Sequence, residues 1–282
     1  MTHIPLLETM AGLERPFDVW FLDIWGVLHN GVRPFTGAVA ACRDFRSQGG
    51  AVILVSNSPR PREGVARQLE SVGVARDAYD AILTSGDVSR TLIAAYQGRT
   101  VFHLGPARDL PVYEGLGVTL GNASDAAAAV CTGLYDDETE TPDDYADLLA
   151  ACQARNLEMI CVNPDLTADR AGRIIFCAGS LAAAYEALGG KVRYAGKPHK
   201  PIYDEAFRMA AALLKRDVPK SRVLAIGDGV KTDIGGALAA GVAAVYVASA
   251  VHMEQGETLS AAAARLFPDA QKRPIAVMTA LA

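Results

Sequence analysis

The chain has 282 residues, of which 50% are hydrophobic and 21% charged, enough for one large domain or two modest ones. Its 27 basic and 32 acidic residues give a net charge of −5, so we expect no nucleic-acid partner, because nucleic-acid binding needs a dense basic stripe. The sequence shows no signal peptide, no apolar run of the roughly 18 residues of a membrane helix, and five scattered cysteines, which predicts a cytoplasmic protein without a membrane partner.

In the first hundred residues, apolar segments of strand length alternate with segments of helical period. The predicted strands are residues 17–25, 51–57 and 81–85, and the predicted helices are residues 36–48, a segment after Pro59, and a segment carrying Val88 and Leu92, capped by Thr84 or Ser85. Residues 51–57 are almost wholly apolar, which is typical of a strand covered on both faces. This alternation predicts βαβ units and a parallel sheet.

The same alternation restarts at about residue 98 and again near residue 191. The predicted elements are strands in TVFHLG, AAVCTGL and LEMICVN, a helix at 143–155, strands in VRYAGKP, RVLAIGDG and AAVYVAS, and helices at 201–215 and 259–266. The polar run 136–144 is predicted to be a solvated loop. We therefore expect an α/β protein with a Rossmann-like parallel-sheet core in two halves and an inserted α/β domain at about 99–191.

Four polar clusters fall at or just beyond the ends of the predicted core strands. They are Asp23, the pair Ser56 and Asn57, Lys197, and the pair Asp228 and Asp233. Open parallel sheets bind ligands beyond the carboxyl ends of their strands. Each cluster alone also has an ordinary explanation, as a helix cap, a solvated surface lysine or a turn.

Together, the four clusters match Mg²⁺-assisted phosphoryl transfer. Magnesium takes carboxylate oxygens and keeps several waters, so two or three aspartates suffice to hold it. A hydroxyl and a lysine bind the remaining phosphoryl oxygens as charge shifts in the transition state. An aspartate can also attack phosphorus directly and form an aspartyl-phosphate.

On these motifs the chain resembles the haloacid dehalogenase (HAD) superfamily, in particular its subclass IIA, the NagD-like phosphatases. Motif one is DIWGV at 23–27, motif two ends at Ser56, motif three is GKP at 196–198, and motif four spans 227–234. Residues 162–165 (VNPD) resemble the substrate-facing TNPD loop of the subclass, and Gly179 lies where the subclass has a Pro-Gly-Ala-Gly motif, so it is expected to allow a close backbone approach. The resemblance spans nearly the whole chain and implies the HAD fold, with a core at 1–98 and 192–282 and a C2-type cap at 99–191.

The resemblance also implies a role for each motif residue. It makes Asp23 the nucleophile, Ser56 and Lys197 the phosphoryl binders, and Asn57, Asn163 and Asp165 substrate-binding residues. Magnesium would be held by Asp23, Asp228 and the backbone carbonyl of Trp25, with Asp233 orienting the metal site. The implied partner is a small phosphorylated metabolite, and because family members often dimerise through their caps, a homodimer is the corresponding expectation.

The chain departs from the family pattern at Trp25. Family phosphatases carry an aspartate there, which protonates the leaving alcohol and then activates water, a contribution typically worth about 10²–10⁴ in rate. The indole N–H has no useful acidity. His29 and Asp165 are candidates to replace this group, although the favoured expectation for His29 is a partly exposed loop histidine.

Two function classes follow from these residues. The first is a Mg²⁺-dependent HAD-type hydrolase of a small phosphorylated metabolite, acting through an aspartyl-phosphate on Asp23. The alternative is a pseudo-enzyme that binds a phosphate ligand, or a phosphotransferase with weak or no hydrolysis, in which Trp25 stacks on a ring. A dinucleotide-dependent oxidoreductase is excluded because no GxGxxG follows the first strand.

Overall fold

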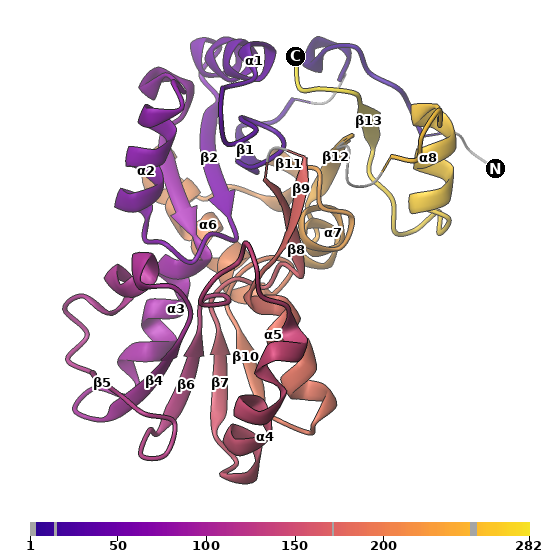
Figure 1. Cartoon of the computed structure of the whole chain (residues 1–282). Coiled ribbons are helices and arrows are strands. Elements are labelled where there is room, and N and C mark those ends of the chain that lie inside the picture. The colour runs from indigo at the N-terminus through magenta and orange to yellow at the C-terminus, as the bar shows by residue number, and fades with distance from the viewer. Residues whose placement is uncertain (1–3, 14–15, 171, 249–252) are drawn as a thin grey trace. The chain divides into compact units, whose positions relative to one another are not determined.

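The computed structural model describes residues 4–13, 16–170, 172–248 and 253–282 (Figure 1). The chain forms two compact units, the first made of Met1–Ser56, Ala66–Leu83 and Tyr203–Ala282, the second of Asn57–Val65 and Thr84–Ile202. Among the described residues, no helix combines the length and the apolar character that crossing a bilayer requires.

A six-stranded sheet belongs to the first unit. Its strand order is β13 (Ala276–Met278), β12 (Ala243–Val247), β11 (Val223–Gly227), β1 (Val19–Leu22), β2 (Ala51–Ser56) and β3 (Ala81–Thr84). The central strand β1 pairs in parallel with β11 on one side and β2 on the other. All residues of these three strands are buried, as expected for parallel strands covered on both faces. The chain adds β2 and β3 on one side of β1 and later adds β11, β12 and β13 on the other, so the strand order reverses at β1. The carboxyl end of β1 is therefore a topological switch point, where such sheets bind ligands.

In the described part of the chain, five helices are associated with this sheet, and all but α7 were predicted from the sequence. They are α1 (Thr36–Ser47), α2 (Arg62–Ser71), α6 (Lys200–Leu214), α7 (Gly236–Ala240) and α8 (Leu259–Leu266), of which α2 and α6 begin within the second unit. Helix α1 buries Val39 and Cys42, and its Phe45 stacks on Trp20 of β1 at 4.1 Å between ring centroids. The first predicted strand, 17–25, was too long, because β1 ends at Leu22 and, after one more ladder hydrogen bond at Asp23, the chain folds into a loop that carries Trp25.

The second unit contains a five-stranded sheet, with β4, β6, β7 and β10 side by side in Figure 1. The strand order is β10 (Val192–Tyr194), β7 (Glu158–Cys161), β6 (Ala128–Cys131), β4 (Thr100–Leu104) and β5 (Thr119–Gly121), all paired in parallel. Helices α4 (Ala146–Ala154) and α5 (Ala178–Ala187) cover one face through Leu149 and Leu181. Helix α3 (Ser85–Ala94) covers the other face through Ile93. The sheet and these helices make a three-layer α/β arrangement, so the α/β fold with two parallel sheets is confirmed.

Several elements of the second unit were not predicted. They are the antiparallel hairpin of β8 (Thr167–Arg170) and β9 (Arg173–Phe176), the strand β5 and the helix α5. The predicted helix 143–155 starts with a 3-10 turn at Pro142–Tyr145 and becomes α-helical only from Ala146. The hairpin strands are only four residues long and contain a single buried residue, Ile175, so they carry little apolar alternation that would reveal them.

Thr84 closes the amino end of α3 with a reciprocal capping box. Its hydroxyl accepts a hydrogen bond from the Asp87 N–H at 2.9 Å, and the Asp87 carboxylate accepts one from the Thr84 N–H at 3.1 Å. We predict that Thr84→Ala lowers the free energy of unfolding by about 1 kcal/mol, because it leaves the half-buried Asp87 N–H without its acceptor. Urea unfolding followed by circular dichroism measures this. The control is Thr279→Ala, which removes a hydroxyl at an exposed bend, and equal effects of the two substitutions would contradict the prediction.

Candidate functional site

Three carboxylates converge at the carboxyl end of β1. Asp23 follows β1 directly, Asp228 follows the neighbouring strand β11, and Asp233 lies in the π-helical turn Val230–Gly235. Each offers one carboxylate oxygen, and the three oxygens lie within 4.8 Å of one another. Asp23 and Asp233 are buried and Asp228 is half-buried. Like charges held this close in a poorly solvated place favour a bound cation, and oxygen donors suit Mg²⁺.

Glycines let the backbone close around these carboxylates. At Gly26, where φ is +82°, an added Cβ would lie 2.3 Å from Oδ2 of Asp228. At Gly227 it would lie 2.2 Å from Cγ of Asp233, and the N–H of Gly229 donates to Oδ2 of Asp233 at 3.0 Å. No side chain fits at Gly26 or Gly227, so both glycines belong to the construction of the carboxylate site. In the sequence, Gly26 and Gly227 are visible only as members of motifs one and four. That no side chain fits at these two positions shows only in the structure.

Ser56, the predicted phosphoryl binder, belongs to the same unit as the carboxylates. It ends β2, which pairs with β1 so that Leu22 lies opposite Leu54. The N–H of Asp23 donates to the carbonyl of Ile226 at 2.9 Å and prolongs the ladder on the other side of β1. Asp23 therefore stands between the ends of the two neighbouring strands, one carrying Ser56 and the other leading to Asp228.

Asn57 and Lys197 form a buried pair in the second unit. The side-chain oxygen of Asn57 accepts from the Lys197 N–H at 2.7 Å, and its Nδ2 donates to the Lys197 carbonyl at 2.9 Å and to Oδ1 of Asp165 at 2.8 Å. Lys197 is only 4% exposed, so the alternative of a solvated surface lysine is wrong. Both amide hydrogens of Asn57 are used inside the protein, and this side chain fixes the backbone that presents Lys197.

The loop carrying Asn163 and Asp165 is held by the start of α5. The Asn163 side-chain oxygen accepts from the Asp165 N–H at 3.1 Å, and the Gly179 N–H donates to the Asp165 carbonyl at 3.1 Å. An added Cβ at Gly179 would lie 2.3 Å from the carbonyl oxygen of Pro164. The expected close backbone approach at Gly179 is therefore confirmed.

The Trp25 side chain packs on its own loop. An added Cβ at Gly31 would lie 2.6 Å from Cη2 of the indole, and the Trp25 and His29 rings meet edge to face with centroids 5.1 Å apart. The Gly26 N–H donates to the His29 carbonyl at 2.9 Å, which folds the loop back toward β1. The indole is thus half-buried and packs against Gly31 and His29 of the same loop.

His29 differs from the expected partly exposed loop histidine. The ring is 1% exposed, because short bridges from Trp25 to His29 and from His29 to Pro34 fold the loop over it. Its Nδ1 accepts a hydrogen bond from the Gly31 N–H at 2.8 Å. Burial lowers the pKa of His29 to about 4, so the imidazole is neutral at pH 7 and carries no proton that an imidazolium would donate.

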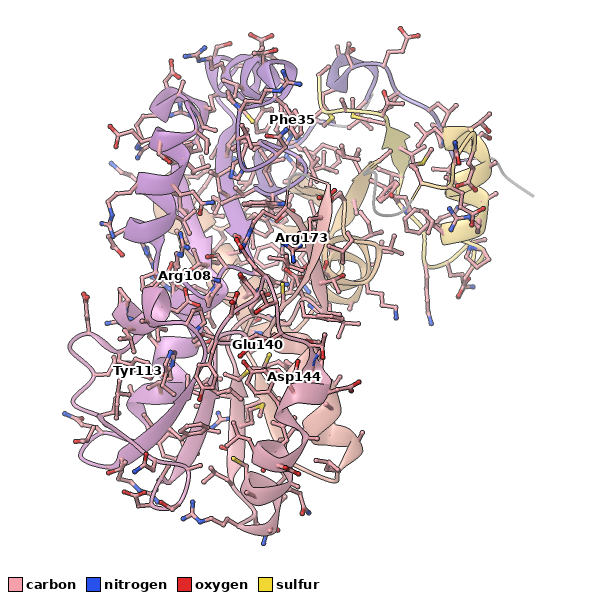
Figure 2. All side chains as sticks on the ribbon, in the orientation of Figure 1. Phe35, Arg108, Tyr113, Glu140, Asp144 and Arg173 are labelled. Atoms are coloured by element: carbon pink, nitrogen blue, oxygen red, sulfur yellow. The ribbon has the colours of Figure 1, made fainter. Side chains whose placement is uncertain are left out.

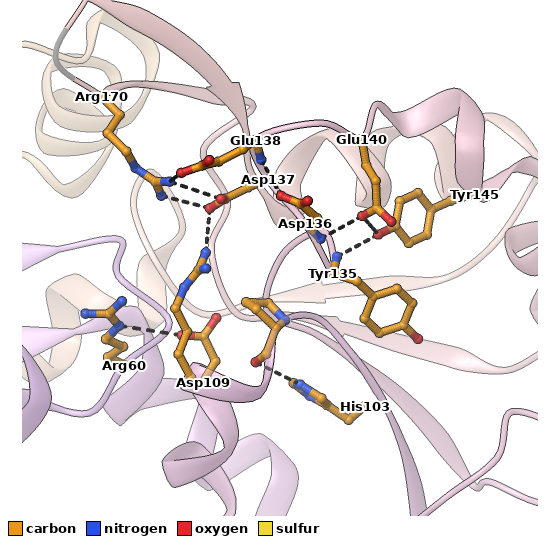
Figure 3. Close-up of polar contacts among 12 residues, drawn as sticks. Arg60, His103, Asp109, Tyr135, Asp136, Asp137, Glu138, Glu140, Tyr145 and Arg170 are labelled. Carbon is orange, nitrogen blue, oxygen red and sulfur yellow. Dashed lines mark hydrogen bonds and ion pairs between the residues drawn. The ribbon is translucent and has the colours of Figure 1, made fainter.

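The polar run 136–144 also differs from a simple solvated loop. Glu138 is exposed, but the Asp137 side chain is only 9% exposed and accepts hydrogen bonds from Arg108 and Arg170 (Figure 3). Arg108 comes from the segment after β4 and Glu140 from this loop (Figure 2). Burial raises the pKa of the Asp137 carboxyl, but the two arginines more than offset this effect and leave the pKa below its usual value. The carboxylate turns inward because two cations of the same unit compensate its desolvation.

The buried His29 predicts a pH dependence of stability. Its pKa is about 4 when folded and 6.5 when unfolded, so between these values only the unfolded chain binds the proton, and stability falls as the pH drops. We predict that the wild type loses about 2 kcal/mol more than His29→Asn between pH 7.5 and 5, since asparagine keeps an acceptor for Gly31 but does not titrate. Urea unfolding in EDTA at both pH values measures this. Parallel losses in the two proteins would contradict it.

Comparisons with known proteins agree with this geometry. A model of haloacid dehalogenase-like hydrolases matches residues 20–119, and a second HAD-hydrolase-like model matches residues 194–272. The chain is 26% identical over 242 residues to a 4-nitrophenylphosphatase of Schizosaccharomyces pombe, covering 77% of this chain and 78% of that protein. It is 27% identical over 247 residues to a D-glycerol 3-phosphate phosphatase of Mycobacterium tuberculosis, covering 86% of this chain and 66% of that protein.

A solved structure is more similar still. The crystal structure of a haloacid dehalogenase-like family hydrolase from Brucella suis 1330 is 46% identical, covers 98% of this chain and 100% of that chain, and superposes with a TM-score of 0.87. The resemblance noted from the motifs is thus confirmed over almost the whole length. The chain belongs to the haloacid dehalogenase-like hydrolase family, within its NagD-like class IIA branch.

Proposed function

We propose that the chain is a Mg²⁺-dependent phosphatase of a small phosphorylated metabolite. The observation that carries this proposal is the convergence of Asp23, Asp228 and Asp233 at the switch point of a parallel sheet. The two curated relatives, which act on 4-nitrophenyl phosphate and D-glycerol 3-phosphate by their names, support a phosphate monoester as substrate. We also propose residues 1–98 and 192–282 as the core domain and 99–191 as the inserted cap.

The proposed roles follow from the chemistry of each group. The carboxylates of Asp23 and Asp228, with the backbone carbonyl of Trp25, would hold the magnesium ion. The ion, when bound, lowers the repulsion between the attacking carboxylate and the phosphoryl oxygens. Asp233 already accepts the Gly229 N–H, and so it would keep the loop that follows Asp228 in place. Ser56 and Lys197 would bind the remaining phosphoryl oxygens.

The reaction would proceed in two displacements at phosphorus. A carboxylate oxygen of Asp23 attacks, an O–P bond forms, and the bond from phosphorus to the ester oxygen breaks, releasing the alcohol. Water then attacks the aspartyl-phosphate, the new O–P bond breaks, and inorganic phosphate leaves while the Asp23 carboxylate is regenerated. The alcohol takes up one proton, and the attacking water gives one up.

Those two proton transfers distinguish the proposed hydrolase from its alternative. Neither the indole of Trp25 nor the buried, neutral His29 supplies an acid. Asp165 stays a candidate, although its Oδ1 already accepts from Asn57. We therefore propose a preference for esters whose alcohols leave without protonation. The alternative, a phosphate-binding pseudo-enzyme or a phosphotransferase with a long-lived aspartyl-phosphate, is favoured by the same lack of an acid.

We predict that Asp23→Asn abolishes phosphate release, because the amide is not a nucleophile toward phosphorus. The assay measures inorganic phosphate from 4-nitrophenyl phosphate and from glycerol 3-phosphate, with Mg²⁺ and with EDTA. Wild-type turnover is expected only with Mg²⁺. Asp143→Asn, which neutralises an exposed aspartate, serves as the control. Equal turnover in EDTA, or persistent turnover in Asp23→Asn, would refute the metal-dependent aspartyl mechanism.

We predict that Trp25→Asp accelerates hydrolysis of glycerol 3-phosphate relative to 4-nitrophenyl phosphate, by up to about 10²-fold, because an alkoxide needs protonation more than a nitrophenolate does. Trp25→Asn is the matched control, since it makes the same cavity without an acid. The ratio of kcat/KM values for the two esters is the measurement. If both variants shift the ratio equally, space rather than acidity limits the wild type, and the proposed role of Trp25 is wrong.

A further inference from the structure

Arginines gather at the carboxyl edge of the five-stranded sheet, within the second unit. The segment after β4 carries Arg108, and the segment after β6 carries Asp137. From β4 the chain continues to β5 on one side, whereas from β6 it continues to β7 on the other. This sheet therefore has its own topological switch point between β4 and β6, which is where open α/β sheets bind ligands.

Asp137 anchors two of these arginines. Arg170 donates to both of its carboxylate oxygens, at 3.0 and 2.8 Å, and Arg108 donates to Oδ2 (Figure 3). The carboxylate is only 9% exposed, whereas the arginine side chains are 40% and 43% exposed. A buried anion thus holds two guanidinium groups at the surface in a set orientation, which lowers the entropy that they lose on binding a ligand.

Asp109 forms a looser ion pair with a third arginine, without a hydrogen bond between them. The Nε of Arg60 lies 3.7 Å from Oδ1 of Asp109, whose side chain is 3% exposed against 35% for Arg60. Burial raises the pKa of the Asp109 carboxyl, while the charges of Arg108 and Arg60 lower it and that of Asp137 raises it. Because Arg108 and Asp109 are neighbours in the chain, the ion pair of Asp109 and the hydrogen bonds to Asp137 belong to one cluster.

The loop that presents Asp137 is stiffened by its own side chains. The Glu140 carboxylate accepts from the Asp136 N–H at 2.7 Å and from the Tyr145 hydroxyl at 2.5 Å. The Asp136 carboxylate accepts from the Glu138 N–H at 2.9 Å and from the Thr139 hydroxyl at 2.8 Å. Asp137 therefore sits on a loop whose conformation is set before any ligand arrives.

The cluster has spare hydrogen-bond donors. A guanidinium has five N–H donors, and toward the described residues Arg108 uses one of them while Arg60 makes an ion pair only. Arg60, Arg108 and Arg170 face the buried carboxylates of Asp109 and Asp137 and the exposed carboxylate of Glu138, whose Oε1 lies 3.8 Å from Nη1 of Arg170, so the charges of this cluster balance and the spare donors are what remain for a ligand. We propose that Arg60 and Arg108 bind an acidic group, a carboxylate or a phosphate, of a small molecule, because planar guanidinium donors match such oxygens in pairs.

Two sources can supply this acidic group. It is either a second acidic group of the substrate, in which case the inference rests on the proposed phosphatase function, or a separate small anion that binds without being hydrolysed. The pair 3-phosphoglycerate and glycerol 3-phosphate separates these sources, because the two esters differ in a terminal carboxylate against a hydroxymethyl group. D-glycerate serves as the free anion.

The first measurement is the ratio of kcat/KM for 3-phosphoglycerate to that for glycerol 3-phosphate. If the substrate is the source, the wild type favours 3-phosphoglycerate, and Arg108→Gln lowers the ratio roughly 10-fold or more, the usual effect of losing a charge-assisted hydrogen bond. Arg108→Lys is expected to keep part of the preference. The matched control is Arg43→Gln, which removes the same charge from a half-exposed arginine paired with Asp77 at 2.8 Å.

The second measurement is calorimetric titration of D-glycerate into the Asp23→Asn protein, alone and combined with Arg108→Gln or Arg43→Gln. If the ratio is unchanged but Arg108→Gln weakens glycerate binding about 10-fold and Arg43→Gln does not, the site takes a free anion. If Arg108→Gln changes neither quantity, the cluster is only a structural ion-pair network and the proposal is overturned. If the wild type hydrolyses no ester, the proposed phosphatase function is wrong. The effect of Arg108→Gln on glycerate binding then decides by itself whether the arginine cluster binds an acidic group.

Discussion

The crowding of three aspartates at the end of β1 is the constraint on which the first unit depends. Burying a carboxylate is costly, and burying it near two others is more so. The backbone holds these carboxylates in place. The parallel ladder brings the ends of β1 and β11 together, and Gly26 and Gly227 occupy positions where no side chain fits. An arrangement that holds like charges this closely is suited to a divalent cation, and the family to which the chain belongs acts as hydrolases.

The second unit handles buried carboxylates differently. Asp109 and Asp137 lie beneath arginines that stay partly exposed, so their charge is balanced from within the unit. Both units thus have buried carboxylates at the carboxyl edge of a parallel sheet. The positive charge that would balance them is a metal ion in the first unit and is supplied by arginines in the second. In the first unit the geometry converges on one point that suits a metal ion. In the second, it spreads guanidinium donors along an edge, which suits an acidic group.

The loop after β1 is where this chain departs from the family pattern, at Trp25. Trp25 and His29 pack on each other and on Gly31, so the position expected to supply an acid contributes hydrophobic packing and a neutral imidazole. Under the proposed phosphatase function, such a loop would offer no proton to a departing alkoxide, and turnover would then depend most on the acidity of the leaving alcohol.

The sequence by itself determined the alternation of strands and helices, the order of the motifs and the residues at the strand ends, because these depend on local periodicity and on residue type. The α1 and α8 boundaries were predictable for this reason, and so was a cap at Thr84 or Ser85, of which the structure shows Thr84. Only the tertiary structure decided that His29 is buried, that Asn57 fixes Lys197 and Asp165, and that Asp137 turns inward. Asn57 lies 108 residues from Asp165 and 140 from Lys197. Burial and hydrogen bonding across such separations depend on how distant segments pack against one another. Local sequence patterns do not predict this packing.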